Sequence, residues 1–241
     1  MVTIGTLFYT LFTRLLLIIV IIFLAIPLIF CLVLPQQLLV NNQLFRIIAQ
    51  FFYWFCIRFS FLPITYKGMQ NIPHKPCIIV ANHQSSFDIP LIGYALKNRL
   101  HVWLAWSEIA KWPLVGFIVT RNAVLVDATS PVKGLRTLVQ AINTVKENPW
   151  DLIIFPEGGR FTDGTVHDFF GGFAAIAKKI DRPVVPIKII DVNKVYPPKS
   201  FWIYYHPITV VIGEPMIMQS DETEEAFKDR VYSWYMHDTK E

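Results

Sequence analysis

Residues 77–88 read CIIVANHQSSFD, a stretch that places a strand, a loop and a helix start in succession. Its first five residues are an unbroken apolar run, which is typical of a strand that is buried on both faces of a sheet. Polar residues follow at once, and Pro90 then suits the first turn of a helix, where its missing N–H costs nothing. We therefore predict a buried strand over 77–82, a loop, and a helix that begins around 87–89.

The chain beyond Pro63 repeats this alternation. Short runs rich in β-branched and aromatic residues predict further strands at 101–106, 122–127, 151–157 and 182–190, and one or two more within 202–213. Helical patterns occupy 89–98, 108–120, 131–148 and 172–180, and an amphipathic helix is expected from Asp221. Strands that alternate with helices predict an α/β fold, with a mostly parallel sheet covered by helices on both faces.

The N-terminal part of the chain is much more apolar than the rest. The whole sequence is 54% hydrophobic with a mean hydropathy of +0.43, and the excess is concentrated in the uncharged run Leu15–Leu34. A helix of about 20 residues spans the hydrocarbon layer of a bilayer. We predict a membrane helix here that is kept in the mature protein. Pro27 is expected to kink it, so that it either spans the bilayer or enters one leaflet and returns.

A second apolar stretch lies between Arg46 and Arg58 and is too short to span a bilayer alone. Its aromatic residues and flanking arginines suit a helix that lies among lipid headgroups. The alternative is a core helix of the soluble domain. The predicted organisation is therefore a membrane-anchoring helical segment over 1–62 and an α/β domain over 63–241.

Charge is divided unevenly along the chain. Residues 1–87 carry five basic side chains and no acidic one, whereas all 18 acidic side chains lie in residues 88–241. A basic, aromatic and apolar end suits an anionic membrane surface better than a nucleic acid. Because four of the five basic residues follow the apolar run, the main domain is expected at the inner, cytoplasmic face of the membrane.

His83 and Asp88 raise the first question of chemistry. Residues five apart face away from each other on a strand and on a helix, so only a turn could bring them together. Histidine is the usual general base near neutral pH, and a carboxylate can fix its tautomer and stabilise its charged form. The alternative is that Asp88 only caps a helix and His83 is a polar loop residue.

The sequence FPEGGRF at 155–161 sits at the end of another predicted strand. Gly158 and Gly159 permit a tight turn, and Arg160 beside free backbone N–H groups suits a phosphate. The alternative is a plain turn with a surface ion pair between Glu157 and Arg160. Because ligands of parallel sheets bind beyond the carboxyl ends of the strands, the two motifs are predicted to share one site.

Several other kinds of site have no support in the sequence. It contains no G-x-S-x-G, no H-E-x-x-H, no G-x-G-x-x-G and no P-loop, which disfavours a serine hydrolase, a zinc enzyme and a nucleotide-binding fold. Cys31, Cys56 and Cys77 do not have metal-ligand spacing and are expected to be reduced, packed thiols. No metal and no cofactor is predicted.

An apolar strand followed by N-H-x-x-x-x-D, then FPEGGR, then V-P-I resembles the glycerolipid acyltransferases, and the bacterial 1-acylglycerol-3-phosphate acyltransferases in particular, over roughly residues 60–215. The resemblance implies their glycerol-phosphate acyltransferase fold and an N-terminal membrane anchor. It also implies transfer of a fatty acyl group from acyl-CoA or acyl-carrier protein to the free hydroxyl of a lysophospholipid. The preferred acceptor would be 1-acyl-sn-glycerol 3-phosphate, and the product phosphatidic acid.

The resemblance also implies a role for each residue of the two motifs. His83 would take the proton of the acceptor hydroxyl, and Asp88 would orient His83. Glu157, Gly158 and Arg160 would bind the acceptor, with the arginine holding the glycerol phosphate. No covalent intermediate is needed, so the serines at 85 and 86 are expected to be turn residues.

Three cations of the family pattern are absent. The sequence has Trp106 and Ser107 where a lysine is usual, Ala128 where an arginine is usual, and Gly171 where a lysine is usual. Each charge-assisted phosphate contact is worth about 1.5–3 kcal/mol. Four cations elsewhere could compensate: Arg121, Lys133, Arg136 and Lys188. Otherwise the acceptor is a larger or less charged lysolipid, or the chain binds lipid through a degenerate site.

Overall fold

The computed structural model describes residues 2–112, 115–127, 129–161 and 163–237. Within them, the centre of the fold is a seven-stranded sheet with the order β1-β7-β6-β2-β5-β3-β4. The strands are β1 (Ile64–Lys67), β2 (Ile78–Ala81), β3 (His101–Trp106), β4 (Ala123–Val126), β5 (Asp151–Ile154), β6 (Val184–Ile190) and β7 (Ile208–Ile212). The strands from β6 to β4 are parallel, β7 is antiparallel to β6, and β1 is parallel to β7. The predicted, mostly parallel α/β sheet is confirmed.

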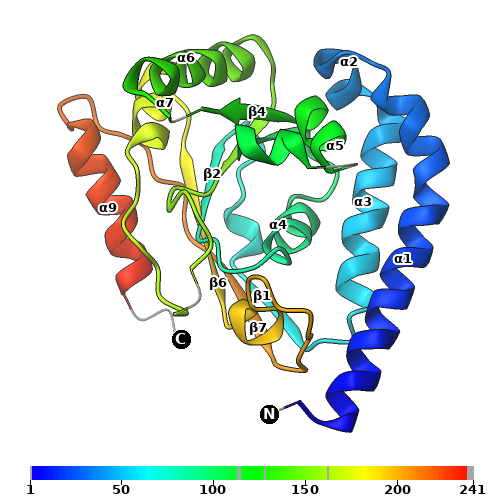
Figure 1. Ribbon diagram of the computed structural model, residues 1–241. Helices are drawn as coiled ribbons and strands as arrows, with labels where there is room; N and C mark the ends of the chain where they lie inside the picture. Colours follow the sequence, from blue (N-terminus) through cyan, green and yellow to red (C-terminus); the bar gives the residue numbers. More distant parts are fainter. Residues whose placement is uncertain (1, 113–114, 128, 162, 238–241) are drawn as a thin grey trace.

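Helices cover both faces of this sheet (Figure 1). The helices of the α/β part are η1 (Met69–Asn71), α4 (Asp88–Leu96), η2 (Ser107–Lys111), α5 (Val115–Asn122), α6 (Pro131–Glu147), α7 (Gly172–Ile180), α8 (Val192–Val195) and α9 (Glu224–Met236). On one face, α6, α7 and α9 bury Val145, Phe173 and Phe227 against the strands. On the other face, α4 buries Leu91 and Ile92. The apolar periodicity of each helix therefore matches one side of a sheet that is covered on both sides.

Some predicted elements differ from the observed ones. Only 208–212 of the stretch 202–213 is a strand, in part because Pro207 cannot donate to a ladder. The short edge strand β1 was not predicted. The helix expected over 108–120 is wrong as one element, since a 3-10 helix precedes α5. The strand at 101–106 is confirmed residue for residue.

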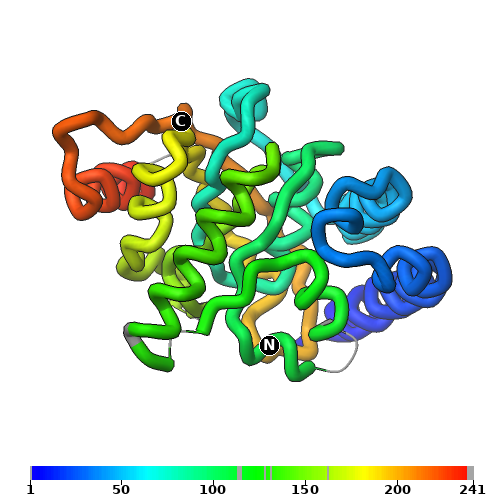
Figure 2. The backbone as a smooth tube through the Cα atoms, turned by 90° about the horizontal axis from the view of Figure 1, so that it is seen from above, coloured from blue at the N-terminus to red at the C-terminus, as the bar shows by residue number. Residues whose placement is uncertain are grey.

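The apolar N-terminus forms α1 (Ile4–Leu32), α2 (Gln36–Asn41) and α3 (Gln43–Arg58). The first helix begins well before the predicted Leu15, because Thr3 caps it by accepting a hydrogen bond from the N–H of Thr6 at 3.1 Å. It continues through Pro27 without ending. It is also long and apolar enough to cross a membrane. Figures 1 and 2 show α1 and α3 side by side, running in opposite directions along one flank of the sheet domain.

The second apolar stretch proves to have two different sides. On the inner side of α3, Tyr53 is buried against α4, and a Cβ on Gly93 would lie 2.3 Å from the Tyr53 ring. Glycine therefore permits this close helix contact. On the outer side Ile47, Phe51 and Trp54 stay exposed. Neither of the two predictions for this stretch describes it alone, since it is both a core helix and an exposed apolar surface.

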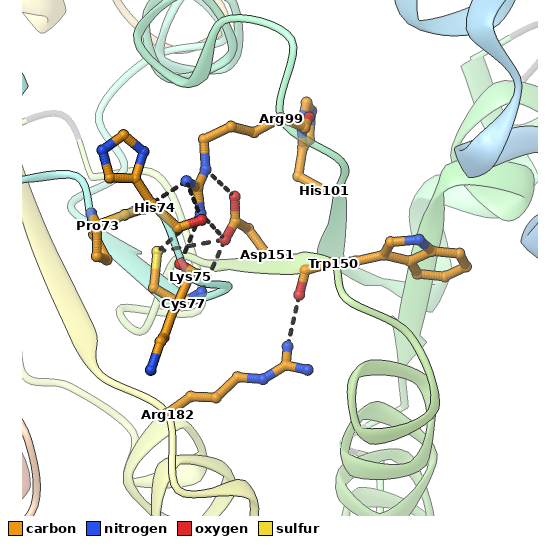
Figure 3. A network of polar contacts seen from close by, with 9 residues as sticks. All are labelled: Pro73, His74, Lys75, Cys77, Arg99, His101, Trp150, Asp151 and Arg182. Atoms are coloured by element: carbon orange, nitrogen blue, oxygen red, sulfur yellow. Dashed lines mark hydrogen bonds and ion pairs between the residues drawn. The ribbon is translucent and has the colours of Figure 1, made fainter.

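A buried ion pair stabilises the sheet at the edge where the parallel strands β2 and β5 begin (Figure 3). Asp151, at the start of β5, is 1% exposed and receives two hydrogen bonds from Arg99, at 2.6 and 2.7 Å. The backbone N–H of Cys77 donates to the same carboxylate at 2.8 Å, which ties β2 to β5. Arg99 also donates to the carbonyls of Pro73 and Lys75. The hydrogen bonds to Asp151 raise the pKa of the Arg99 guanidinium, so the guanidinium stays charged.

The cysteines agree with the sequence prediction. Cys31, Cys56 and Cys77 are free, and two of them are fully buried. Burial, followed by the charge of Asp151, raises the pKa of the Cys77 thiol. The thiol is therefore protonated and unreactive, and it packs as a small apolar group.

Removing the guanidinium should destabilise the fold strongly. The variant Arg99→Met keeps the apolar stem but leaves the Asp151 carboxylate buried and unpaired. The free energy of unfolding should therefore fall by about 3–5 kcal/mol. Denaturant unfolding in detergent micelles measures this. The control is Lys178→Met, because Lys178 and Glu224 pair at 3.7 Å with both side chains about half exposed. That change should cost less than about 1 kcal/mol, and equal effects of the two variants would contradict the structural role of the buried pair.

Candidate active site

The strand β2 is held firmly where it leads into the NHQSSFD stretch. The side chain of Asn82 donates to the carbonyl of Ile189 at 2.9 Å and accepts from the N–H of Ile189 at 2.7 Å. From α9, the hydroxyl of Tyr235 donates to the carbonyl of Val80 at 2.6 Å. These hydrogen bonds fix the carboxyl end of β2, which lies between β6 and β5, and the loop that follows starts there.

The loop brings His83 and Asp88 together. His83 Nδ1 lies 2.8 Å from Asp88 Oδ2, and the same oxygen accepts from the N–H groups of Gln84 and Ser85 at 2.8 and 2.9 Å. Asp88 is fully buried at the first turn of α4, where the helix dipole favours a negative charge. The alternative that Asp88 is a plain helix cap is wrong, because Phe87 occupies the cap position and the two N–H groups precede the helix.

The surroundings of His83 keep its imidazole neutral. The ring is stacked on Phe155, with centroids 3.8 Å apart and planes at 14°, and His83 is only 8% exposed. Burial lowers the pKa of His83, and the nearby Arg160 lowers it further, whereas the hydrogen bond to Asp88 raises it. Because Nδ1 faces the carboxylate, Nε2 is the nitrogen that can accept a proton.

Glu157 points into the protein. It is 4% exposed, and its two carboxylate oxygens accept the backbone N–H groups of His83 at 2.7 Å and His167 at 2.8 Å. Burial raises the pKa of Glu157, while these two hydrogen bonds oppose the shift. A surface ion pair between Glu157 and Arg160 does not occur in the described part of the chain, so the plain-turn alternative is wrong. Glu157 instead links the two motifs to each other.

The glycine after Glu157 is required by its surroundings. Gly158 has a φ of 67°, and a Cβ there would lie 2.7 Å from the ring of Phe170. The carbonyl of Gly158 accepts a hydrogen bond from Trp106 Nε1 at 2.7 Å. Trp106, which stands where the family has a lysine, therefore supports the motif loop. An exposed Phe170 lies beside the loop as well.

Arg160 is the cation that the structure places beside the pair. Its guanidinium is partly buried, and burial lowers its pKa, while the charges of Asp88 and Tyr196 raise it. Its Nε is buried and has no hydrogen-bond partner among the described residues. An unsatisfied guanidinium N–H next to a general base is well suited to an anionic group of a ligand.

The four possible substitute cations make other contacts. Arg121 donates to the carbonyl of Leu34, Lys188 donates to that of Tyr235, and Lys133 pairs with Asp127 at 3.0 Å. Arg136 lines a cleft between α6 and α2. Gly171 is exposed with open space around it, and Ala128 lies outside the described residues. These contacts involve neither motif, so compensation by these cations stays a prediction.

Several residues that shape the site were not identified as site residues from the sequence. Asn82, Phe155, His167 and Tyr235 all hold or cover the two motifs. Asn82 and Phe155 are next to the motif residues, which is a signal that sequence reading could have used. His167 lies ten residues after Glu157, and Tyr235 lies 155 residues after Val80, so only the fold brings them to the motifs.

The environment of His83 predicts how it titrates. Its pKa should lie below the ordinary value of 6.5, so that the ring is mostly neutral at pH 7. Asp88→Asn should lower this pKa further, because the carboxylate is what stabilises the protonated form, and Arg160→Gln should raise it. NMR titration of the imidazole measures all three. An unchanged pKa in Asp88→Asn would show that the 2.8 Å contact does not govern the ring.

Comparisons with known proteins identify the family of the chain. Residues 63–190 match the family model described as Acyltransferase. A 1-acyl-sn-glycerol-3-phosphate acyltransferase of Pseudomonas aeruginosa is 31% identical over 153 residues, 62% of this chain and 58% of that protein. One from Limnanthes douglasii is 28% identical over 171 residues, 70% of this chain and 60% of that protein. The chain thus spans about 60% of the length of these curated relatives.

A solved structure shares the fold almost from end to end. The 1-acyl-sn-glycerophosphate (LPA) acyltransferase PlsC from Thermotoga maritima has a TM-score of 0.78 and 24% sequence identity, and the match covers 98% of this chain and 96% of that one. The family match covers more than half of the chain and includes strand β2, the His83 loop and the FPEGGR motif. The chain belongs to the acyltransferase family.

Proposed function

We propose that this chain transfers a fatty acyl group from acyl-CoA or acyl-carrier protein to the free hydroxyl of a lysophospholipid, with 1-acyl-sn-glycerol 3-phosphate as the preferred acceptor. The observation that carries the proposal is the buried pair of His83 and Asp88 beside Arg160. Family membership and the names of the relatives support the same reaction. The product would be phosphatidic acid, a precursor of phospholipids.

The proposed mechanism uses the imidazole as a general base. As the acceptor hydroxyl attacks the thioester carbonyl, His83 Nε2 takes its proton, and Asp88 stabilises the imidazolium that forms. The tetrahedral intermediate then expels the thiolate of the donor, and the imidazolium returns the proton to that sulfur. The acyl group never joins the protein, so the reaction needs no nucleophilic side chain, metal or cofactor.

Arg160 is proposed to hold the phosphate of the acceptor. Its unpartnered Nε is a donor for a phosphate oxygen, and a guanidinium can bind phosphate through two parallel hydrogen bonds. Glu157 and Gly158 would shape the loop that presents this arginine. In the proposal, the acceptor hydroxyl meets His83 while the phosphate is fixed at Arg160.

One observation supports a second acceptor class. Trp106 and the exposed Phe170 lie beside Gly158, at a place where the family pattern has cations. A larger or less charged lysolipid could use this aromatic surface. The intact contact between His83 and Asp88 argues against a lipid-binding protein with a degenerate site.

We also propose that α1 lies in one leaflet of the membrane, on the cytoplasmic side. Thr10 on one side of the helix is fully buried against the sheet domain. The other side carries an exposed apolar surface, formed by Phe8, Leu11, Leu15, Ile18, Ile22, Phe23, Ile26, Ile29 and Phe30. A helix that stays attached along the domain cannot cross the bilayer unless the domain enters it too. Burial of this apolar surface in lipid then gives the affinity.

The first test of the reaction is the variant His83→Ala. Because a general base contributes about 10²–10⁴-fold to a rate, this change should lower acyl transfer by that factor. Initial rates with acyl-CoA and with acyl-carrier protein, over a panel of lysolipid acceptors, measure it. The control is His74→Ala, an exposed histidine at the opposite end of β2 that should keep the parent rate. Parent-like transfer by His83→Ala would rule out the mechanism, and lysolipid binding without turnover by the parent protein would favour the binding function.

The second test concerns the acceptor phosphate. Arg160→Gln should raise KM for 1-acylglycerol 3-phosphate about tenfold or more, because one charge-assisted contact is lost. The value of KM for the acyl donor should stay the same. Lys133→Gln is the matched comparison, since Lys133 already pairs with Asp127. A larger rise in Lys133→Gln would place the phosphate near β4 instead, and a parent preference for an uncharged or bulky lysolipid would favour the aromatic acceptor site.

A further inference from the structure

A loop after β6 connects the N-terminal helix to the catalytic centre. It runs from Val195 to Tyr204, is closed by a 2.8 Å hydrogen bond between these two backbones, and is here called the connecting loop. Thr10 of α1 exchanges two hydrogen bonds with the backbone of Ile203 in this loop, at 3.1 and 3.2 Å. The apolar helix is therefore hydrogen-bonded to the loop as well as packed beside the domain.

Arg14 makes the second contact between α1 and the connecting loop. It is the only charged residue in the sequence of this helix. Its Nε and Nη2 donate to the carbonyl of Phe201 at 3.0 and 2.5 Å, and Nη2 also lies 3.4 Å from the hydroxyl of Tyr196. The guanidinium lies over both rings, 4.5 Å from the centroid of Phe201 and 5.5 Å from that of Tyr196. A cation in so apolar a helix is costly unless it is paired, and here the protein itself supplies the partners.

The other side of Tyr196 faces the His83 loop. The carbonyl of Tyr196 accepts a hydrogen bond from Ser85 Oγ at 2.8 Å, and the same Oγ accepts from the N–H of Phe87 at 3.1 Å. The backbone N–H of Ser85 in turn donates to Asp88 Oδ2, the oxygen that faces His83. Ser85 is fully buried, so these hydrogen bonds are shielded from water. A single residue, Tyr196, thus contacts both Arg14 and the loop that holds the catalytic carboxylate.

We propose that Arg14 is a positioning residue for the pair of His83 and Asp88. It would act through the connecting loop, with Tyr196 and Ser85 carrying the effect to the carboxylate. The inference rests on the proposed function and adds to it that the seating of α1 on the domain sets the geometry of the general base. Misplacement of a catalytic group by about 1 Å can cost about 10²-fold in rate, so a small loosening of this loop matters.

The central test is the variant Arg14→Gln in the full-length protein, assayed in vesicles of phosphatidylethanolamine and phosphatidylglycerol. Its kcat should fall about tenfold, because a loosened loop misplaces the general base, with both KM values unchanged. Binding to the vesicles should stay the same, because the guanidinium faces the protein. Arg14→Lys should recover part of the rate, since an ammonium can still donate to the carbonyl of Phe201.

The control variant is Thr13→Ala, next to Arg14 on the same helix. The Thr13 hydroxyl donates to the carbonyls of Tyr9 and Thr10 in its own helix, at 2.8 and 3.1 Å. Its removal should leave kcat unchanged. If Arg14→Gln keeps the parent kcat, or loses rate only in step with vesicle binding, Arg14 is a membrane contact and the proposal is wrong.

A double-mutant cycle tests the route through Ser85. If Arg14 acts on the catalytic loop through Tyr196 and Ser85, the two changes should not be additive. Arg14→Gln should then lower kcat by a much smaller factor in a Ser85→Ala protein than in the parent. Additive losses would contradict the route.

Amide hydrogen exchange provides a test that does not depend on activity. In Arg14→Gln, the N–H groups of Gln84 and Ser85 should exchange faster, while those of β2 and β5 should not change, which also shows that the variant is folded. Faster exchange in Arg14→Gln, together with a parent protein that transfers no acyl group, would refute the proposed function and keep the positioning role. Unchanged exchange in an active enzyme would refute the positioning role alone.

Discussion

The Asp88 carboxylate is the constraint on which the rest of the site depends. A fully buried negative charge is very costly unless donors surround it. Its Oδ2 receives the imidazole and two backbone N–H groups, all from the six residues that precede α4. Those three donors can meet one oxygen only if the chain turns sharply after β2. The same charge that supports a general base therefore also folds the loop that carries it.

The second motif is joined to the first through its own buried carboxylate. Because β2 and β5 are neighbours in the sheet, Glu157 can accept the N–H of His83 from the adjacent strand end. The N–H of His167 completes the pair of hydrogen bonds, so the loop after β5 is also tied down. Two acidic residues thus organise two loops, and Arg160 lies beside them as a cation that interacts with the charge of Asp88.

The sequence revealed the parts of this arrangement that are local. The apolar run before Asn82 and the position of Pro90 were enough for a strand, a loop and a helix start, and parallel strands put both motifs at one edge. The inward turn of Glu157 was not predictable, because it depends on which strands are neighbours. The bond from Tyr235 to β2, and the pairing of Arg99 with Asp151, join segments far apart in sequence. Hydrophobic periodicity and residue propensity predict local structure only, so they cannot predict contacts that form when distant segments pack together.

The position of α1 follows from the same long-range logic. The composition of α1 alone allows a helix that spans the bilayer, because its length and apolarity do not distinguish a spanning helix from one that lies in a single leaflet. The polar contacts of Thr10 and Arg14 hold one side of the helix to the loop after β6, which supports the position in one leaflet that we propose. That loop adjoins the carboxyl end of β2, where His83 stands. Under the proposed function, a lysolipid in the leaflet that receives α1 would thus meet the general base beside the membrane surface, and its acyl chain could stay in lipid while its hydroxyl reacts.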